Sequence, residues 1–153
     1  MGKKKKAASE KQDSQPEIYS VAKAEKHALP LFISPVAAGF PSPAEDYQDR
    51  KLDLNDLLIK RPSSTFFVRV SGPSMTGAGI FDGDLLVVDR SLTATDNKIV
   101  IAVVNGEFTV KRIRKKGERI FLQPENSSFK EMEILPGMDF TVWGVVVYCI
   151  HKV

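Results

Sequence analysis

The sequence predicts a mostly β domain preceded by an extended, flexible N-terminal arm. From Thr65 onward, short runs rich in β-branched and aromatic residues alternate with turn residues, a pattern typical of strands. Before this region, residues 1–28 are polar and poor in aromatic residues, and residues 29–44 carry four prolines, a density that excludes a regular helix. A chain of 153 residues with 42% hydrophobic residues has the size and composition of one packed domain.

Six segments after residue 64 have the composition of strands. They are residues 65–70, 84–89, 98–104, 107–113, 119–124 and 140–150. Turn residues separate them at short intervals and no internal repeat is present, which indicates one β domain. Upstream of the strands, residues 52–60 (LDLNDLLIK) predict one short helix, with Asp53 or Asn55 near its start and Pro62 just past its end.

Composition limits the classes of protein to consider. The single cysteine, Cys149, excludes an intramolecular disulfide and fits a reducing cytoplasm. No stretch approaches the ~20 apolar residues of a membrane-spanning helix, and no apolar segment follows the basic N-terminus, as a secretory signal requires. We therefore expect a cytoplasmic protein without a membrane partner.

The net charge of the chain is confined to its leading segment. Residues 1–38 contain seven lysines and four acidic residues, whereas residues 39–153 contain fifteen residues of each sign. Because the larger part is neutral, we expect no direct sequence-specific DNA binding. The leading segment opens with four lysines, Lys3 to Lys6. We interpret it as a solvated tail, although a basic arm can also bind nucleic acid or an acidic partner.

One hairpin can be placed closely. Asn105-Gly106 between two strand-like runs is the strongest short-range signal of a hairpin, and a two-residue turn there pairs Val100 with Lys111. On this register Lys111 shares a face with Val100, Ala102, Thr109 and Ile113. The face is either apolar and buried, which is unusual for a lysine, or it is the solvent face of an edge strand. The pattern leaves both interpretations open.

Few side chains in this chain can act as a catalytic base. The only histidines are His27, in the polar leading segment, and His151, close to the C-terminus. Neither is well placed as a rigid base, and the sequence predicts no metal site and no cofactor. A serine nucleophile would therefore need a lysine as its base. The pKa of that lysine must fall by roughly three units from ~10.4, and burial on an apolar β face, the setting predicted for Lys111, lowers it.

The candidate nucleophile lies in the segment SGPSM, residues 71–75. Gly72 and Pro73 break the strand that begins at Thr65. Ser74 therefore falls at a strand end, where backbone N–H groups can turn inward as an oxyanion hole. Serines are also common in ordinary turns, and SGPSM alone is more often a turn than a nucleophile.

Several segments together resemble a known family. SGPSM (71–75), GDLLVVD (83–89) and GEFTVKRI (106–113) resemble the peptidase domain of the LexA/UmuD family of self-cleaving serine–lysine peptidases. AAGFPSPAEDY (37–47) and LDLNDLLIKRPSSTFFVRVSG (52–72) are similar to the UmuD-type members, which are cleavable accessory subunits of an error-prone DNA polymerase. The resemblance covers about residues 29–150, and its motifs are specific jointly although each alone is weak.

The resemblance implies roles for individual residues. Ser74 matches the nucleophile and Lys111 the general base, while Ala38-Gly39 matches the bond that the family cuts in its own chain. It also implies a compact LexA/UmuD peptidase-like β domain over residues 39–153 and a basic arm, residues 1–38, that self-cleavage removes. The leading segment is longer than in the UmuD type, and alanine before the scissile bond is typical of LexA-like sites.

The resemblance further implies a function and partners. It predicts an SOS-response mutagenesis protein that forms a homodimer and whose self-cleavage is stimulated by a RecA filament on single-stranded DNA. The shortened product would then support translesion synthesis by a UmuC-like subunit of a Y-family polymerase. No cofactor is implied.

Other interpretations must be weighed against this one. A LexA-like or phage repressor needs a helix-turn-helix, and residues 1–38 contain no pair of amphipathic helices. A signal peptidase shares the serine–lysine chemistry but normally has a membrane anchor. A non-catalytic binding module that keeps the fold predicts an uncut chain even at high pH.

Overall fold

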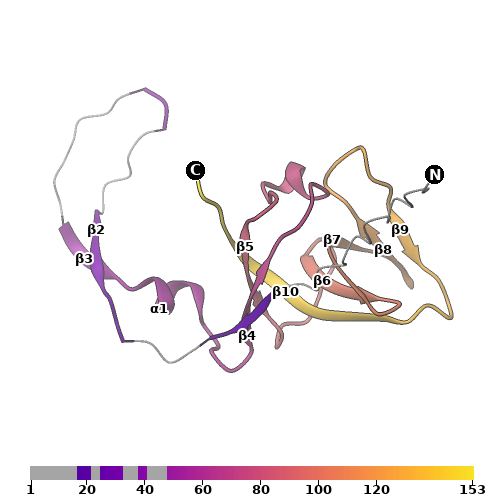
Figure 1. The fold of residues 1–153 in the computed structure, drawn as a ribbon, viewed down its shortest axis with the longest axis horizontal. Coiled ribbons are helices and arrows are strands. Elements are labelled where there is room, and N and C mark those ends of the chain that lie inside the picture. Colours follow the sequence, from indigo (N-terminus) through magenta and orange to yellow (C-terminus); the bar gives the residue numbers. More distant parts are fainter. Residues whose placement is uncertain (1–16, 22–24, 33–37, 41–47) are drawn as a thin grey trace, which may run out of the picture.

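The computed structural model of the chain describes residues 17–21, 25–32, 38–40 and 48–153 (Figure 1). Eight strands form one antiparallel sheet in the order β1-β4-β5-β10-β6-β7-β8-β9, and β2 and β3 form a separate two-stranded sheet. The elements are β1 (Ile18–Ser20), β2 (Leu29–Phe32), β3 (Gln48–Leu52), α1 (Leu54–Leu58), β4 (Thr65–Arg69), the 3₁₀ turn η1 (Thr76–Ala78), β5 (Leu85–Asp89), β6 (Ile99–Val104), β7 (Glu107–Lys116), β8 (Arg119–Gln123), β9 (Met132–Ile134) and β10 (Phe140–Ile150).

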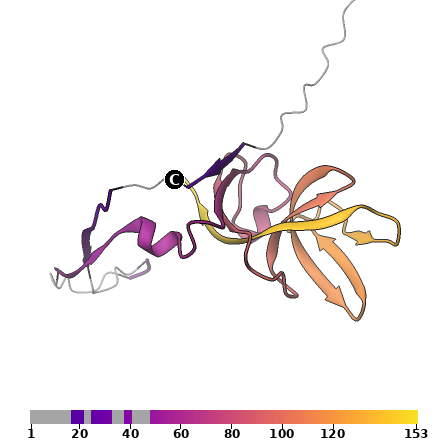
Figure 2. The same ribbon diagram turned by 90° about the horizontal axis from the view of Figure 1, so that it is seen from below.

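The longest strand, β10, joins the two halves of the large sheet. It pairs with β5 through its C-terminal part and with β6 through its N-terminal part, and Figure 2 shows it running across the molecule between the two groups of strands. Alternation along β6 places Ile101 in one buried cluster and its neighbours Val100 and Ala102 in a second, because successive side chains of a strand point to opposite faces. The core therefore has two parts, one on each face of β6.

The prediction of a mostly β fold is confirmed. Each of the six predicted strands is present, with β7 extending three residues beyond its predicted end. The predicted helix is α1, and the Asp53 side chain caps it by accepting a hydrogen bond from the Asn55 N–H at 2.8 Å. No helix within the described part of the chain is long and apolar enough to cross a bilayer.

The predicted hairpin register is also confirmed. Val100 lies opposite Lys111 and Val104 opposite Glu107. Asn105 and Gly106 have positive φ angles of 49° and 84°, as the central residues of a tight hairpin turn require. Strand β7 pairs with β6 along residues 107–112 and with β8 at residues 112–116. Val100, Ala102 and Ile113, which share the face of Lys111, are buried, so the alternative of a solvent face is excluded.

Four short strands were not predicted. Strands β1, β2, β3 and β9 have three to five residues each, which is too few for a period-two pattern to stand out. Strand β1 lies in the predicted arm, yet it pairs with β4 in the large sheet. The Lys3 to Lys6 run and most of the arm lie outside the described residues, and the division at residue 38 stays a prediction.

Asp89, at the end of β5, is a carboxylate that is only 4% exposed. It accepts hydrogen bonds from the Ser64 hydroxyl at 2.9 Å, from the Arg61 guanidinium at 3.0 Å, and from the N–H and hydroxyl of Ser91 at 2.8 and 2.7 Å. Burial opposes ionisation, but the hydrogen bonds outweigh it and lower the pKa of Asp89 to about 2. The carboxylate therefore fastens the segment before β4 to the end of β5.

We expect Asp89→Asn to lower the free energy of unfolding by about 2 kcal/mol at pH 7, because donors arranged around a carboxylate would face an amide NH₂. Since the pKa of Asp89 is lower in the folded state, its contribution is present above the ordinary value of 3.8 and is lost as the pH falls from roughly 4 towards 2. Urea denaturation measures both effects. The matched control is Asp139→Asn at an exposed position, expected within about 0.5 kcal/mol of wild type. Equal stability of the two variants at pH 7 would contradict this prediction.

Candidate functional site: a serine and a half-buried lysine

The structure brings Ser74 and Lys111 into contact. Ser74 lies in the turn between β4 and η1, and Lys111 lies in the middle of β7. The Lys111 Nζ is 3.0 Å from the Ser74 Oγ, a hydrogen-bonding distance between residues 37 positions apart in the sequence. The contact is partly buried and is not sealed from solvent.

The surroundings of Lys111 favour its neutral form. The residues that share its face, Val100, Ala102 and Ile113, are all at most 1% exposed. Burial lowers the pKa of Lys111 below its ordinary value of 10.5, and desolvation is the only cause that acts on it. No carboxylate in the described part of the chain forms an ion pair with this amine, so no counter-charge offsets the desolvation of the ammonium.

Three oxygen atoms surround the amine. Besides the Ser74 hydroxyl, the Thr109 Oγ1 lies 2.8 Å away and the Val110 carbonyl oxygen 3.0 Å away. A neutral amine has two N–H groups and one lone pair. If the N–H groups donate to Thr109 and to the Val110 carbonyl, the lone pair is left for the proton of the Ser74 hydroxyl. This geometry suits a base that accepts a proton from serine.

The turn that carries Ser74 is held from both sides. On one side the Gly72 N–H donates to the Asp82 carboxylate at 2.7 Å. On the other side the Glu125 N–H donates to the Ser74 carbonyl at 2.8 Å and the Gly77 N–H donates to the Glu125 carbonyl at 2.6 Å. A Cβ on Gly77 would lie 2.5 Å from that carbonyl oxygen, so this close approach requires glycine.

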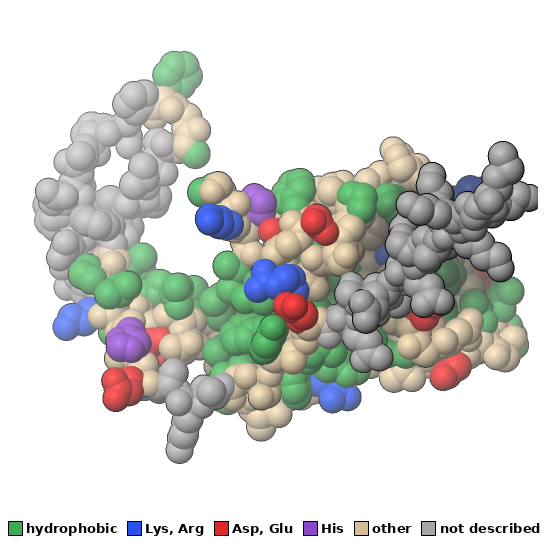
Figure 3. Space-filling view, viewed as in Figure 1, with side chains coloured by type: hydrophobic (Ala, Val, Ile, Leu, Met, Phe, Trp, Pro, Cys, Tyr) green, Lys and Arg blue, Asp and Glu red, His purple; other side chains and the backbone are tan. Residues whose placement is uncertain are grey.

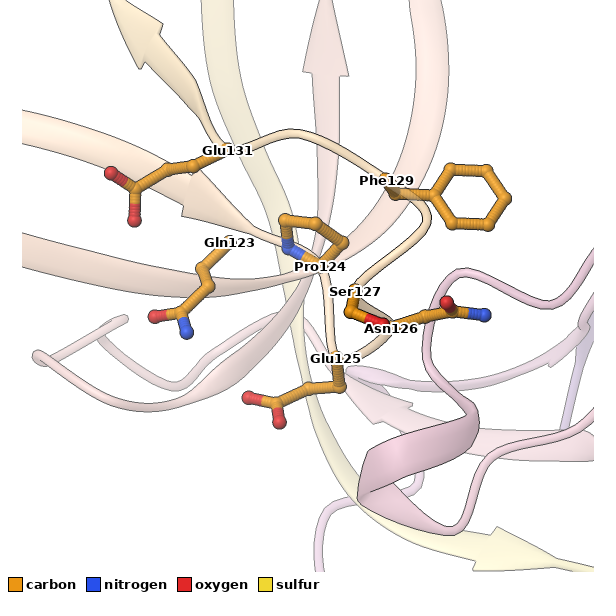
Figure 4. Close-up of a pocket in the computed structure, with 7 residues that line it drawn as sticks. All are labelled: Gln123, Pro124, Glu125, Asn126, Ser127, Phe129 and Glu131. Atoms are coloured by element: carbon orange, nitrogen blue, oxygen red, sulfur yellow. The ribbon is translucent and has the colours of Figure 1, made fainter.

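Asn126 adds a side-chain contact to this turn. Its amide donates to the Pro73 carbonyl at 2.9 Å and to the Thr76 hydroxyl at 3.4 Å. Figure 4 shows Asn126 pointing towards η1, at one end of a cavity of about 410 Å³ along residues 123–131. Glu125, beside it, is paired with Arg112 of β7. The segment after β8 thus links the serine turn to the strand that carries Lys111. Sequence reasoning missed these residues, since nothing local marks them.

Two backbone N–H groups beside the serine have no acceptor within the described residues. These are the N–H groups of Ser74 and Met75, and the Met75 side chain is 1% exposed. Unpaired backbone N–H groups next to a nucleophile are what an oxyanion hole requires.

The predicted scissile bond, by contrast, is not at the site. Residues 38–40 form an exposed bend, Phe40 is 94% exposed, and no atom lies within 4 Å of a Cβ built on Gly39. Figures 1 and 2 both show this segment on the side of β2 and β3, away from the large sheet. The structure therefore describes an arrangement in which Ala38-Gly39 is not in contact with Ser74.

The histidines and the cysteine lie elsewhere in the fold. The His151 Nδ1 is 2.7 Å from the buried Asp84 carboxylate, and the Cys149 thiol donates to the same carboxylate at 3.3 Å. His27 uses its backbone N–H to donate to the Asp53 side chain at 2.7 Å. Within the described residues no group of three or more His, Cys, Asp or Glu side chains could hold a metal ion.

Comparison with known proteins finds one matching family profile and several relatives of similar sequence. The sequence profile described as "Peptidase S24-like" matches residues 30–147. Protein MucA of Salmonella typhimurium is 44% identical over 125 residues, which cover 81% of this chain and 85% of that protein. Protein SamA of the same species is 47% identical over 80% of this chain and 85% of its own length. The LexA repressor of Acidithiobacillus ferrooxidans is 43% identical over 85% of this chain and 64% of its length.

Proposed function

Because the chain belongs to the Peptidase S24-like family, we propose that it is a self-cleaving serine peptidase in which Ser74 and Lys111 cut the Ala38-Gly39 bond. The observation that carries this proposal is the 3.0 Å contact between the Ser74 hydroxyl and a lysine whose pKa is lowered by burial. A serine hydroxyl is a weak nucleophile until a neighbouring base removes its proton. The usual alternative base is a histidine, but the ring of His151 lies against the Asp84 carboxylate, and within the described residues no hydrogen bond joins either histidine to Ser74.

In the first half of the reaction, neutral Lys111 takes the hydroxyl proton as the Ser74 Oγ attacks the carbonyl carbon of Ala38. The free N–H groups of Ser74 and Met75 donate to the resulting oxyanion. When the tetrahedral intermediate collapses, the bond between the Ala38 carbon and the Gly39 nitrogen breaks, and Lys111 returns the proton to that nitrogen. The products of this half are an ester between Ser74 and Ala38 and a new N-terminus at Gly39.

In the second half, Lys111 accepts a proton from water, and the hydroxide attacks the ester carbon. Collapse then releases a leader of residues 1–38 that ends in a carboxylate, and the proton returns to the Ser74 oxygen. The leader carries the whole net charge of the chain. Since the Ala38-Gly39 bond occurs once in each chain and its loss is permanent, the reaction is a switch that operates once and not a turnover of many substrates.

Cleavage requires a movement of the segment around residue 38. Because this bend is exposed and apart from the serine, the described state is a resting one, and the rate depends on how often the segment enters the site. We propose that a RecA filament on single-stranded DNA stimulates cleavage by favouring the docked state. The segment enters either its own site or that of a partner in a homodimer.

The proposed biological role is SOS mutagenesis in the cytoplasm. The shortened chain would act with a UmuC-like Y-family polymerase subunit in translesion synthesis. The relatives MucA, ImpA and SamA, at 44 to 47% identity over four fifths of the chain or more, support this assignment. A non-catalytic binding module is the second candidate. It is disfavoured because a half-buried lysine without a counter-charge costs stability and contributes only if it acts as a base.

We expect the purified chain to convert into two products of residues 1–38 and 39–153, and the Ser74→Ala chain to remain intact. Intact-mass spectrometry at neutral and alkaline pH, with and without RecA, ATP and single-stranded DNA, measures both. The matched control is Ser71→Ala in the same turn, which retains cleavage because Ser71 does not contact Lys111. Cleavage at another bond, or undiminished cleavage in Ser74→Ala, would refute the mechanism.

Asn126 offers a test of positioning. We expect Asn126→Ala to slow cleavage about tenfold, because the Pro73 carbonyl loses its donor and the serine turn moves relative to Lys111. The cleavage site and the position of the pH profile should be unchanged, since no group that titrates is altered. Ser127→Ala, an exposed neighbour, should cleave at the wild-type rate. An Asn126→Ala chain as fast as Ser127→Ala would show that the amide does not position Ser74.

A further inference from the structure

Strand β1 covers an edge of the large sheet. It is the outermost strand and pairs with β4 alone among the described strands, in antiparallel register with Ile18 opposite Val68 and Ser20 opposite Phe66. On its other side β4 pairs with β5. If β1 left, β4 would become the edge strand, with a row of unpaired N–H and C=O groups. Strand β1 lies upstream of residue 38, so the proposed cut removes it from the chain that carries β4.

The backbone alternation shows which amides would be freed. The Arg69 N–H donates to the Glu17 carbonyl at 3.4 Å, whereas the Val70 N–H donates to the Asp84 carbonyl at 2.8 Å. In an antiparallel strand successive N–H groups point to opposite sides. The N–H groups of Phe67 and Arg69 therefore face β1, and those of Phe66 and Val68 face β5.

Two side chains of the β1 segment indicate which kind of residue the β4 edge would bind. Ile18, opposite the buried Val68, packs against the cluster of buried residues on its face, and Figure 3 shows hydrophobic side chains gathered where β1, β4 and β5 lie. Next to it, the Glu17 carboxylate is 3.4 Å from the Arg69 guanidinium. Departure of β1 thus leaves an apolar position without its cover and an arginine without its carboxylate.

We propose that β1 is a removable cover, and that the β4 edge which it protects binds an extended segment of a partner protein. This inference rests on the proposed self-cleavage for its trigger. The segment pairs with β4 as an added strand and repeats the chemistry of the cover, with an acidic residue against Arg69 followed by an aliphatic residue against Val68. Main-chain hydrogen bonds supply affinity and these two side chains supply specificity.

The proposed cut lowers the fraction of time for which β1 occupies the β4 edge, although the contacts between the two strands are the same before and after it. A three-residue strand with one exposed ion pair binds weakly, because such pairs contribute little in water. While the chain is intact, the tether keeps β1 at an effective concentration of roughly millimolar, which suffices to hold it in place. After the cut, only the non-covalent β1–β4 and β2–β3 pairings hold the leader. Once the leader dissociates at micromolar concentration it no longer competes, and the edge becomes available to a partner.

The first test asks whether β1 covers the β4 edge, and it does so independently of the proposed self-cleavage. All variants carry Ser74→Ala, so no chain is cut, and Ile18→Asp is compared with Tyr19→Asp. Tyr19 is 52% exposed and alternates to the other face. Tyr19→Asp loses the 3.3 Å hydrogen bond from the Tyr19 hydroxyl to Glu17 but keeps the apolar contact of Ile18, so it is the matched control. By amide hydrogen exchange we expect Phe67 and Arg69 to exchange at least about tenfold faster in Ile18→Asp than in Tyr19→Asp. Phe66 and Val68 should keep their protection in both, which shows that the fold is intact.

The second test measures whether an added peptide binds to the uncovered β4 edge. The probe is a fluorescently labelled peptide that copies residues 15–22, titrated into the same two full-length variants. We expect saturable binding to Ile18→Asp, with Phe67 and Arg69 protected again, and at least about tenfold weaker binding to Tyr19→Asp, whose own β1 competes. Adding Arg69→Glu to the Ile18→Asp chain should weaken binding of this peptide, and a peptide with Glu17→Lys should restore it.

Three outcomes would overturn the proposal. The first is that the amides of Phe67 and Arg69 exchange at equal rates in the two variants. The second is that the affinity of the peptide is the same with and without the charge reversal at Arg69, and the third is that sedimentation shows the Ile18→Asp chain to self-associate through this edge in place of binding the peptide. Since every chain in these tests lacks Ser74, a failure here leaves the cleavage mechanism standing. A failure of cleavage, conversely, shows itself in the intact-mass experiment alone.

Discussion

Replacing Lys111 by arginine will abolish self-cleavage although the positive charge is kept. The guanidinium does not deprotonate in proteins, so it cannot take the Ser74 proton. Removing one member of a nucleophile–base pair commonly costs about 10⁴-fold or more in rate, and we expect a loss of this size. Intact-mass spectrometry of the chain over days at alkaline pH measures it, since the wild-type chain should be cut completely there.

The control for this change is Lys115→Arg. Lys115 also lies in β7 and is exposed, so the same substitution should leave the cleavage rate within a factor of about two. A circular dichroism spectrum and a urea titration must show that the Lys111→Arg chain is folded, since the longer side chain has to fit a half-buried position. A folded Lys111→Arg chain that is cut at more than about a tenth of the wild-type rate would exclude Lys111 as the base.

The second large effect is the dependence of cleavage on pH. Only the neutral amine of Lys111 can accept the serine proton, so the rate should rise about tenfold per pH unit and level off above the pKa of Lys111. Burial lowers the pKa of Lys111 below 10.5, and the plateau should therefore begin below that pH. Rates of the first-order conversion, measured by intact mass from neutral pH to pH 10.5, give the profile.

Stability should change with pH in a related way. The pKa of Lys111 is lower in the folded than in the unfolded state, so between the two values the unfolded chain binds more protons and stability rises with pH. Ser74→Ala, which is not cut, permits this measurement and also shows that alkali alone does not break the chain. A cleavage rate that is flat from pH 7 to pH 10.5, or that falls with pH, would contradict a lysine base.

Much of this fold followed from local patterns. The Asn105-Gly106 turn sets the register of β6 and β7 because only a few residues accept positive φ at both turn positions, and the period of two then assigns Lys111 its face. The helix cap at Asp53 and the strands from Thr65 onward are likewise set by neighbours in the chain. Local patterns only suggested the candidate pair, since Ser74 follows a strand break and the chain offers few histidines. The resemblance to the LexA/UmuD family gave both residues their predicted roles.

Long-range contacts decided the rest. Whether the face of Lys111 is buried depended on the cluster in which its neighbours Val100, Ala102 and Ile113 pack with Leu122 of β8 and Val145 of β10. The 3.0 Å contact with Ser74 depends on the segment at Glu125 and Asn126 that holds the serine turn. Neither feature has a local signature, because the partners are tens of residues apart. The cover strand β1 is the extreme case. Three residues carry no readable periodicity, and only their pairing with β4 shows that a cut at residue 38 would open an edge of the sheet.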